Sequence, residues 1–173
     1  MTIKREDELK DSAHWSAVEE IAELLQEERF REATVELRRV LQADPANPYA
    51  FYFLGVAFFE IGELEAARDA YGACLRLAPR HLGARVALSH VVRILGDIRG
   101  SVREGMTALS QSPGDPDALH ALGLAHHAYG DDVAAKKYLE AFLASGPEFE
   151  VAVEVRALLA SLPGNEAPGN DQD

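Results

Sequence analysis

Histidine is the residue type in this sequence with the widest chemical range, and three of its six copies fall at related positions. His120 and His127 lie seven residues apart, so one helix would carry both on one face, and His90 should lie on the neighbouring helix. Zinc needs three or four ligands at about 2.0–2.1 Å, and side chains at i and i+7 are too far apart to share one ion. We therefore expect no metal here. A surface whose binding responds to pH stays open as an alternative, because histidine titrates near neutrality.

No other group of residues forms a catalytic pattern. The sequence has no Gly-rich phosphate loop, no nucleophile elbow and no HExxH motif. Cys74 is the only cysteine, which excludes an internal disulfide and a four-cysteine metal site. We expect it to be a small, buried, apolar thiol. The sequence therefore predicts no enzymatic activity and no cofactor.

The composition narrows the classes of partner. The net charge is −12, which opposes both nucleic-acid binding and adhesion to an anionic membrane. A partner with a basic face, or one that is mostly apolar, fits better. The first residues lack the apolar region of a signal peptide, and no apolar run reaches the roughly 18 residues that a membrane span needs. The expectation is a cytoplasmic protein without membrane insertion.

A period of 34 residues, set by prolines, organises the chain. The prolines in this register are Pro45, Pro79, Pro113 and Pro147. A column of turn residues follows the same period and reads Glu28, Gly62, Gly96 and Gly130. A column of mostly small residues reads Ile21, Gly55, Ser89 and Gly123, which would let two helices approach closely. A second small column reads Ala33, Ala67, Ser101 and Ala135.

The stretch from Pro48 to Pro79 is the clearest copy of the period. Its first half carries Phe51, Leu54, Gly55 and Phe58 at the spacing of one helix face, and its second half carries Ala67, Tyr71 and Cys74. With Phe in place of Trp and Tyr, this is the pattern W-x2-L-G-x2-Y, A-x3-F, P. On these columns residues 14–147 resemble the tetratricopeptide repeat family. The resemblance implies an all-α fold, a right-handed superhelical solenoid of four helix-turn-helix repeats at about 14–47, 48–81, 82–115 and 116–149.

The periodicity predicts the extent of each element. The predicted helices are 12–27, 30–43, 47–61, 64–77, 81–95, 98–111, 115–129 and 132–145. Apolar residues after Pro147 recur at helical spacing, so a C-terminal capping helix is predicted over 148–161, which ends the domain 12–162. Residues 1–11 are charged and lack periodicity, and residues 163–173 are rich in Pro, Gly and acids, so both ends are predicted to be disordered.

The resemblance also implies a binding surface, because in the family the first helix of each pair lines a concave groove that holds peptides. Leu54, Gly55 and Phe58 mark the side of the first helix that faces the core. The opposite face of each first helix is therefore available to line the groove. The candidate groove residues are Trp15, Val18, Tyr49, Tyr52, Val56, Phe59, Val86, His90, Arg93, Asp117, His120, Leu124 and His127. The aromatic end of this groove suits an amphipathic helix or an extended apolar peptide. Trp15 is displaced from the family's Trp column, so it lies either in the groove or over the open end.

Arg93 has two readings. It receives an acidic side chain or a chain terminus of the partner, or it pairs internally with Asp117. Some domains of the family grip the C-terminal carboxylate of heat-shock chaperones with Lys and Asn. The corresponding positions here hold Val18, Ala22 and Phe53, so that partner class is not expected.

The third repeat has an unusual residue in its second helix. Gly105 stands where Tyr71 stands one repeat earlier, which leaves space in the core. Met106 fills that space, or the helix is a soft joint, or the region contacts another subunit. These three alternatives remain open at this stage.

The sequence favours a protein-interaction scaffold or adaptor that binds a peptide or amphipathic helix of a partner in its aromatic groove. A partner with an apolar or aromatic segment, with or without a basic face, is expected. One alternative is a cytosolic chaperone of the secretion type, since a small acidic repeat protein resembles the chaperones of bacterial type III translocators. Another alternative is a homo-oligomeric scaffold, in which one chain docks in the groove of its neighbour.

Overall fold

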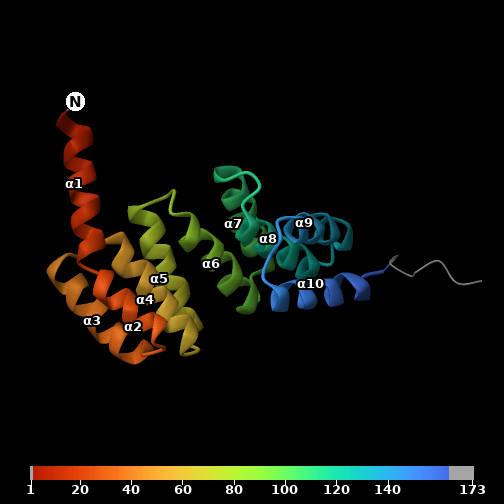
Figure 1. Ribbon diagram of the computed structural model, residues 1–173, viewed down its shortest axis with the longest axis horizontal. Helices are drawn as coiled ribbons and strands as arrows, with labels where there is room; N and C mark the ends of the chain where they lie inside the picture. The colour runs from red at the N-terminus through yellow and green to blue at the C-terminus, as the bar shows by residue number, and fades with distance from the viewer. Residues whose placement is uncertain (1, 164–173) are drawn as a thin grey trace, which may run out of the picture. The chain divides into compact units, whose positions relative to one another are not determined.

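The computed structural model describes the backbone of residues 2–163 and the side chains of residues 6–163. Over this range the chain forms ten α-helices and no strand, which confirms the predicted all-α helical repeat fold (Figure 1). The helices are α1 (Thr2–Ser16), α2 (Glu19–Gln26), α3 (Phe30–Ala43), α4 (Pro48–Glu60), α5 (Leu64–Leu77), α6 (Leu82–Ile94), α7 (Ile98–Gln111), α8 (Pro116–Tyr129), α9 (Asp132–Ala144) and α10 (Phe149–Ser161). From α3 onward the bounds agree with the predicted ones within one residue at each end.

The chain divides into two compact units, residues 1–91 and 92–173, with the boundary inside α6. In the first unit α2 packs against α3, α3 against α4, and α4 against α5, while α1 contacts α2 and α4. In the second unit α7 packs against α8, α8 against α9, and α9 against α10. Each unit thus consists of helices that follow one another in sequence and contact one another, as a repeat architecture requires.

Short polar side chains start several of these helices. Asn47 accepts a hydrogen bond from the backbone N–H of Ala50 at 3.1 Å, and Pro48 follows as the first residue of α4. Asp97, Asp115 and Asp131 accept the equivalent bond at the starts of α7, α8 and α9. Each bond satisfies an amide that would otherwise lack a partner at the helix end.

The turn column has one backbone conformation throughout. Gly62, Gly96 and Gly130 have φ values of 82°, 90° and 85°, in the left-handed region that favours glycine. Glu28, which stands in this column in the first repeat, adopts φ 58°. The position therefore demands a left-handed turn whatever residue occupies it, and the first repeat accepts a strained glutamate there.

The N-terminal region differs from the prediction. Where disorder was predicted over 1–11, α1 begins at Thr2 and continues to Ser16. The predicted helix 12–27 is interrupted at Ala17 and Val18, where Val18 is fully buried, and α2 begins at Glu19. The tail predicted to be disordered lies outside the described residues from position 164 onward.

Small residues permit the close packing inside each helix pair. A Cβ atom on Gly55 would lie 2.6 Å from the ring of Tyr71, and one on Gly123 would lie 2.6 Å from Leu139. At Gly105 the space is taken by Leu122, whose Cδ1 would lie 3.1 Å from an added Cβ. Met106 is 48% exposed, so the prediction that it fills this space is wrong. Leu122 fills it because α8 packs directly against α7.

Candidate functional site

Five aromatic rings gather in the first unit and form what we call the aromatic cluster: Trp15, Tyr49, Tyr52, Phe53 and His81. Trp15 lies edge-on to Tyr49 at 5.5 Å and is tilted against Phe53 at 6.0 Å between centroids. Tyr52 lies 5.2 Å from Phe53 and 4.6 Å from His81. These spacings are those of favourable aromatic contacts, so the rings support one another as a continuous surface.

A set of buried polar contacts holds α1 against the start of α4. The Nδ2 group of Asn47, which is fully buried, donates a hydrogen bond to the backbone oxygen of His14 at 2.9 Å. The Nε2 atom of His14 lies 2.9 Å from a carboxylate oxygen of Asp44. These contacts place Trp15, the next residue of α1, beside Tyr49 and Phe53. Trp15 packs on these two rings of α4 with 41% of its surface exposed.

Tyr49 links the aromatic cluster to an acidic rim on α1. Its hydroxyl donates a hydrogen bond to a carboxylate oxygen of Asp11 at 2.8 Å. Burial, together with this bond to Asp11, raises the pKa of Tyr49, so the phenol stays neutral and remains a donor. The cluster therefore presents apolar ring surface next to carboxylate charge.

His81 closes the cluster on the side of α6. Its Nδ1 atom accepts a hydrogen bond from the backbone N–H of Ala84 at 3.1 Å, so the imidazole caps the start of α6. Burial lowers the pKa of His81, which keeps the ring neutral and able to accept this bond. A Cβ on Gly83 would lie 3.2 Å from the Tyr52 hydroxyl oxygen, so the backbone of α6 approaches that ring closely.

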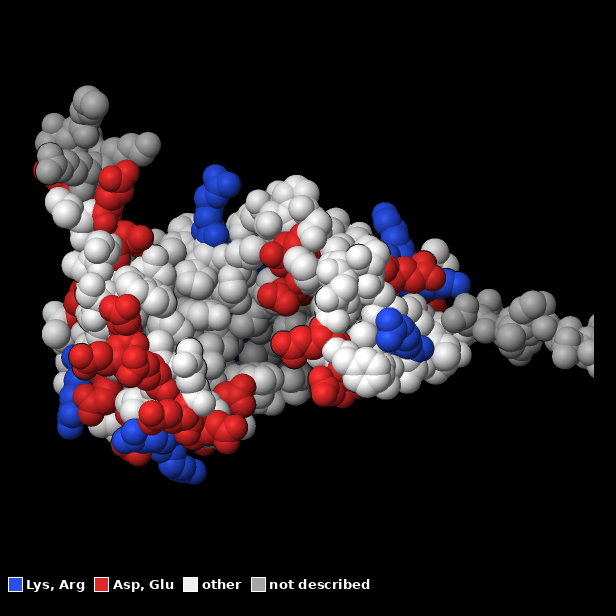
Figure 2. All heavy atoms as spheres, viewed as in Figure 1, with Lys and Arg blue, Asp and Glu red and all other residues white. Residues whose placement is uncertain are grey.

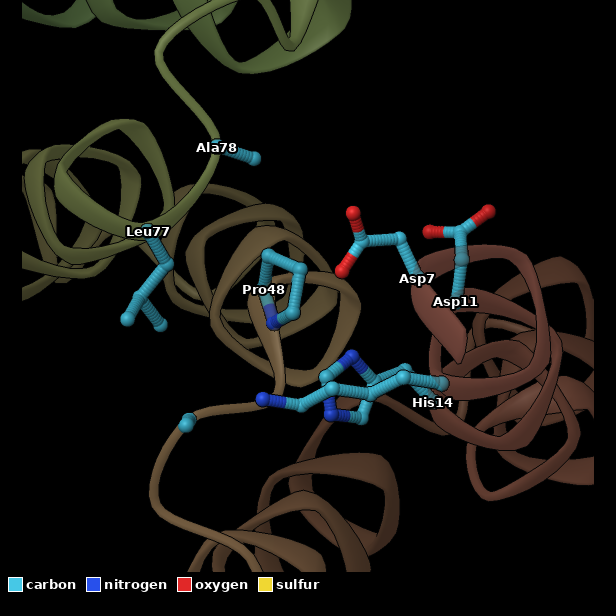
Figure 3. A pocket seen from close by; sticks show the side chains of 8 residues that line it. Asp7, Asp11, His14, Pro48, Leu77 and Ala78 are labelled. Carbon is cyan, nitrogen blue, oxygen red and sulfur yellow. The ribbon is translucent and has the colours of Figure 1, made fainter. Parts of the chain in front are cut away.

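A hollow of about 280 Å³ adjoins the acidic rim (Figure 3). Asp7, Asp11 and His14 of α1 line one side of it, and Pro48, Leu77 and Ala78 line the other. In Figure 3 the two carboxylates extend from α1 on the side that faces Pro48. Figure 2 shows further Asp and Glu side chains gathered over α2 and α3. The hollow thus carries the carboxylates of Asp7 and Asp11 beside the ammonium group of Lys10.

The other predicted groove residues of the first unit differ in how deeply they are buried. Val56, Phe59 and His90 are half-buried, as are Tyr49 and Tyr52 in the cluster. Val18 is fully buried and packs in the core with Ile21 and Leu37, so its assignment to the groove is wrong. Val86 is also buried and is corrected in the same way. Small apolar side chains at these positions reach only into the core, whereas the longer aromatic side chains of α4 reach the surface.

In the second unit the predicted groove residue His120 packs on an aromatic ring beside a hollow. His120 stacks on Phe142 with 4.6 Å between ring centroids and 17° between the planes. A hollow of about 410 Å³ lies beside this pair and is lined by Pro116, Asp117, His120, Phe142, Ser145, Gly146, Pro147, Glu148 and Val151. Burial lowers the pKa of His120, with a further lowering from the Arg93 charge, while Asp117 and Glu154 act in the opposite direction. Leu124 is half-buried, and Asp117 and His127 are exposed.

Arg93 is half-buried and does not pair with Asp117, the internal partner that the sequence offered. Among the side chains of residues 6–163, no carboxylate lies within ion-pair distance of its guanidinium, and its buried Nε atom has no hydrogen-bond partner. Burial lowers the pKa of Arg93. The structure therefore leaves a positive charge on α6 without a counter-charge.

Comparison with known families decides the identity of the repeats. A family model described as a tetratricopeptide repeat matches residues 24–88, which span α3 to α5 together with parts of α2 and α6. Residues 24–88 belong to the tetratricopeptide repeat family. No curated protein sequence matches it at a significant level.

Known structures share the fold of this repeat protein over most of its length. MamA from Desulfovibrio magneticus RS-1 has a TM-score of 0.74 at 18% identity, covering 85% of this chain and 81% of that one. YrrB, described as a repeat protein with an unusual peptide-binding site, has a TM-score of 0.70 at 19% identity, covering 87% and 77%. The first repeat domain of Spaghetti, bound to the HSP90 peptide SRMEEVD, has a TM-score of 0.64 at 16% identity, covering 68% and 93%.

The histidines of this repeat protein pair with carboxylates or stack on rings. The Nδ1 atom of His127 lies 3.6 Å from Asp132, and His126 stacks on Tyr138 at 5.4 Å. In the described part of the chain no three His, Cys, Asp or Glu residues are placed to hold a metal ion. No described helix is long and apolar enough to cross a membrane.

Sequence reasoning missed two members of the aromatic cluster of this repeat protein, Phe53 and His81. His81 follows Pro79 at the start of a predicted helix, and that position was a signal for a capping residue. Phe53 lies one residue beyond Tyr52, is half-buried and packs against the core of the first unit. No local pattern in the sequence distinguishes it from a core residue.

Proposed function

We propose that this protein is a protein-interaction scaffold that binds an apolar peptide segment or amphipathic helix of a partner protein on the aromatic cluster. The observation that carries the proposal is the cluster itself. A tryptophan with 41% of its surface exposed lies against Tyr49 and Phe53, and Phe53 in turn lies against Tyr52. Tyrosine and tryptophan offer large contact areas with few rotatable bonds, so they lose little entropy on binding.

The charge around the cluster favours a partner with basic residues next to its apolar segment. Asp11 accepts the Tyr49 hydroxyl and still presents carboxylate charge at the rim, and Asp7 lies one turn away on α1. Opposite charges at the rim of an interface mainly increase the association rate and the specificity. A cationic side chain flanking the bound apolar segment would meet this rim.

Two structures of similar fold support binding of peptides. YrrB is described as having a peptide-binding site, and the Spaghetti domain is bound to a peptide. The likeness in sequence is low, so the residues that bind those peptides are not transferred to this chain. The proposal rests on the residues that this chain itself exposes.

The experiment uses Trp15 as an internal probe, because it is the only tryptophan and belongs to the cluster. Peptides that bind the purified protein are selected from a displayed library of random peptides and then titrated into the protein. We expect a blue shift of the tryptophan emission, because a bound apolar segment removes water from the exposed part of Trp15.

Matched variants decide whether the cluster is the binding surface. Replacement of Tyr49 and Tyr52, two members of the cluster, by Ala should weaken binding about tenfold or more while the far-UV circular dichroism stays helical. The control is Tyr129→Ala, an exposed tyrosine at the end of α8, which should bind like the wild type. If the double variant binds the peptides with unchanged affinity, the cluster is not the binding surface and the proposal fails.

A further inference from the structure

We propose that Arg93 is the acceptor of a carboxylate group of the bound partner. This inference rests on the proposed function and concerns a residue of the second unit that would hold one acidic group of a peptide. The geometry behind it is a half-buried guanidinium whose Nε atom is buried without a hydrogen-bond partner. A buried charge of this kind is costly unless it is paired, so an unpaired one points to a partner that arrives from outside.

The other arginines make the contrast clear. Arg29, Arg39 and Arg68 are exposed, where water would solvate them, and yet each contacts a carboxylate at 2.6–2.8 Å. Arg93, which is half-buried, has no such contact. Within residues 6–163 only Arg85 and Arg93 are not classed as exposed.

Arg85, whose Nε atom is also buried without a hydrogen-bond partner, differs from Arg93 because another nitrogen of its guanidinium is bonded within the fold. Its guanidinium donates a hydrogen bond to the backbone oxygen of Pro79 at 2.7 Å, which ties the side chain to the loop before α6. Arg93, two turns later on the same helix, has no hydrogen bond of this kind in the described chain. It occupies the column of Phe59 and His127, which is the groove-side column of the repeat.

The surroundings of Arg93 suit a carboxylate better than a doubly charged phosphate. A guanidinium presents two parallel N–H groups that match the two oxygens of a carboxylate. The charges of Asp117, Glu154 and Arg93 each shift the pKa of His120, so all three lie within electrostatic reach of its ring. The carboxylates repel a dianion about twice as strongly as a monoanion. The net charge of −12 acts in the same direction.

His120 supplies an independent readout of an anion at Arg93. The Arg93 charge lowers the pKa of His120, in addition to the larger effect of burial. A carboxylate bound to the guanidinium would offset that charge, and the His120 pKa would rise. A structural role of Arg93 alone would produce no such response.

The first arm of the test uses acetate as the probe and needs no peptide. Acetate is titrated at constant ionic strength, with chloride as the reference anion, while NMR follows the Arg93 Nε–H signal and the His120 ring. We expect acetate to shift the Arg93 signal and raise the His120 pKa in the wild type and in the Arg99→Gln control. The Arg93→Gln variant should show no acetate-dependent rise. If acetate and chloride give the same signals in the wild type, the proposal is overturned.

The second arm uses peptides and identifies the source of the carboxylate. Wild type and the Arg93→Gln variant each select from random peptides, and the selected peptides are synthesised with free and with amidated C-termini. An excess of Asp or Glu at one position indicates a side chain, whereas loss of binding on amidation indicates the chain terminus. Either carboxylate should bind the variant about tenfold more weakly or worse.

The outcomes of this arm separate the two proposals. Peptides that bind wild type and variant equally, without acidic excess, overturn the role of Arg93 and leave the scaffold function standing. If no peptide is selected by either protein, the proposed function fails, whatever acetate does at Arg93.

Discussion

The ring of Tyr52 lies 4.6 Å from the ring of His81, between centroids, with 38° between the two planes. His81 also caps α6 through Nδ1, which accepts the N–H of Ala84. One histidine therefore joins the candidate binding surface to the start of the next helix. Protonation of its ring would remove the cap and place a charge beside Tyr52.

The first prediction concerns pH. Burial lowers the pKa of His81 below the value of about 6.5 that it has in an unfolded chain. The unfolded chain therefore binds this proton more readily, so the stabilisation is complete above about pH 6.5 and is lost as the pH falls below it. We expect urea unfolding, followed by Trp15 fluorescence, to give a free energy of unfolding that decreases from about pH 7 to pH 5. In the His81→Asn variant, which keeps a capping side chain, the decrease should be smaller. An equally steep decrease in the variant would contradict the assignment.

The second prediction concerns the stability of the second unit without a ligand. Replacement of Arg93 by Met keeps most of the packed stem and removes an unpaired, half-buried charge, so the free energy of unfolding should rise by about 1 kcal/mol. Thermal unfolding of the ligand-free protein by circular dichroism measures this. Arg99→Met on α7 removes an exposed arginine and should change stability by less than about 0.5 kcal/mol. A loss of stability in Arg93→Met would mean that the charge already has a stabilising partner in the fold.

The third prediction compares two glycines on helices that pack together. Gly55→Ala should destabilise the protein by about 1–3 kcal/mol, because the new Cβ would lie 2.6 Å from the Tyr71 ring. At Gly72 the nearest atom to an added Cβ is the Arg76 side chain at 3.6 Å. Gly72→Ala should therefore be neutral or stabilise α5 by up to about 1 kcal/mol. Urea unfolding of both variants gives the two signs, and equal effects would show that the close approach at Gly55 is not needed.

The fourth prediction concerns the attachment of α1. Asn47→Ala removes the cap of α4 and also the bond to the His14 backbone oxygen, so it should cost about 2–3 kcal/mol. Asp115→Ala removes only a cap, at the start of α8, and should cost about 1 kcal/mol. In Asn47→Ala, limited proteolysis should also cut faster after Lys10, because α1 loses a contact with α4. Unchanged cleavage would show that other contacts suffice to hold α1.

The sequence predicted the fold well at positions where a single physical constraint decides which residue type fits. Gly55 and Gly123 must be small because Tyr71 and Leu139 occupy the space beside them. The turn column required a left-handed backbone, and even Glu28 adopts it. These constraints act within a few residues or recur every repeat, so a single sequence displays them.

The candidate site was predicted less completely, because its members depend on where side chains meet in space. Tyr49, Tyr52 and Trp15 were predicted from their columns, but His81 joins them from the first position of a predicted helix, where the period alone does not show that its ring reaches Tyr49 and Tyr52. Val18 shares a column with Tyr52 and is nevertheless buried, since a break between α1 and α2 turns it inward. Whether Arg93 had an internal partner was also beyond the sequence, because pairing is set by distances between helices.

The reactivity of Cys74 can report how often the first unit opens. The thiol is fully buried, and burial raises its pKa to about 12, so neither the sulfur nor its reactive thiolate is presented to solvent in the folded unit. As it is the only cysteine, a thiol reagent reacts with the chain only when this part of it opens. The rate of alkylation of the unmodified protein therefore counts opening events of residues 1–91, and a ligand on the aromatic cluster should slow it in proportion to its occupancy.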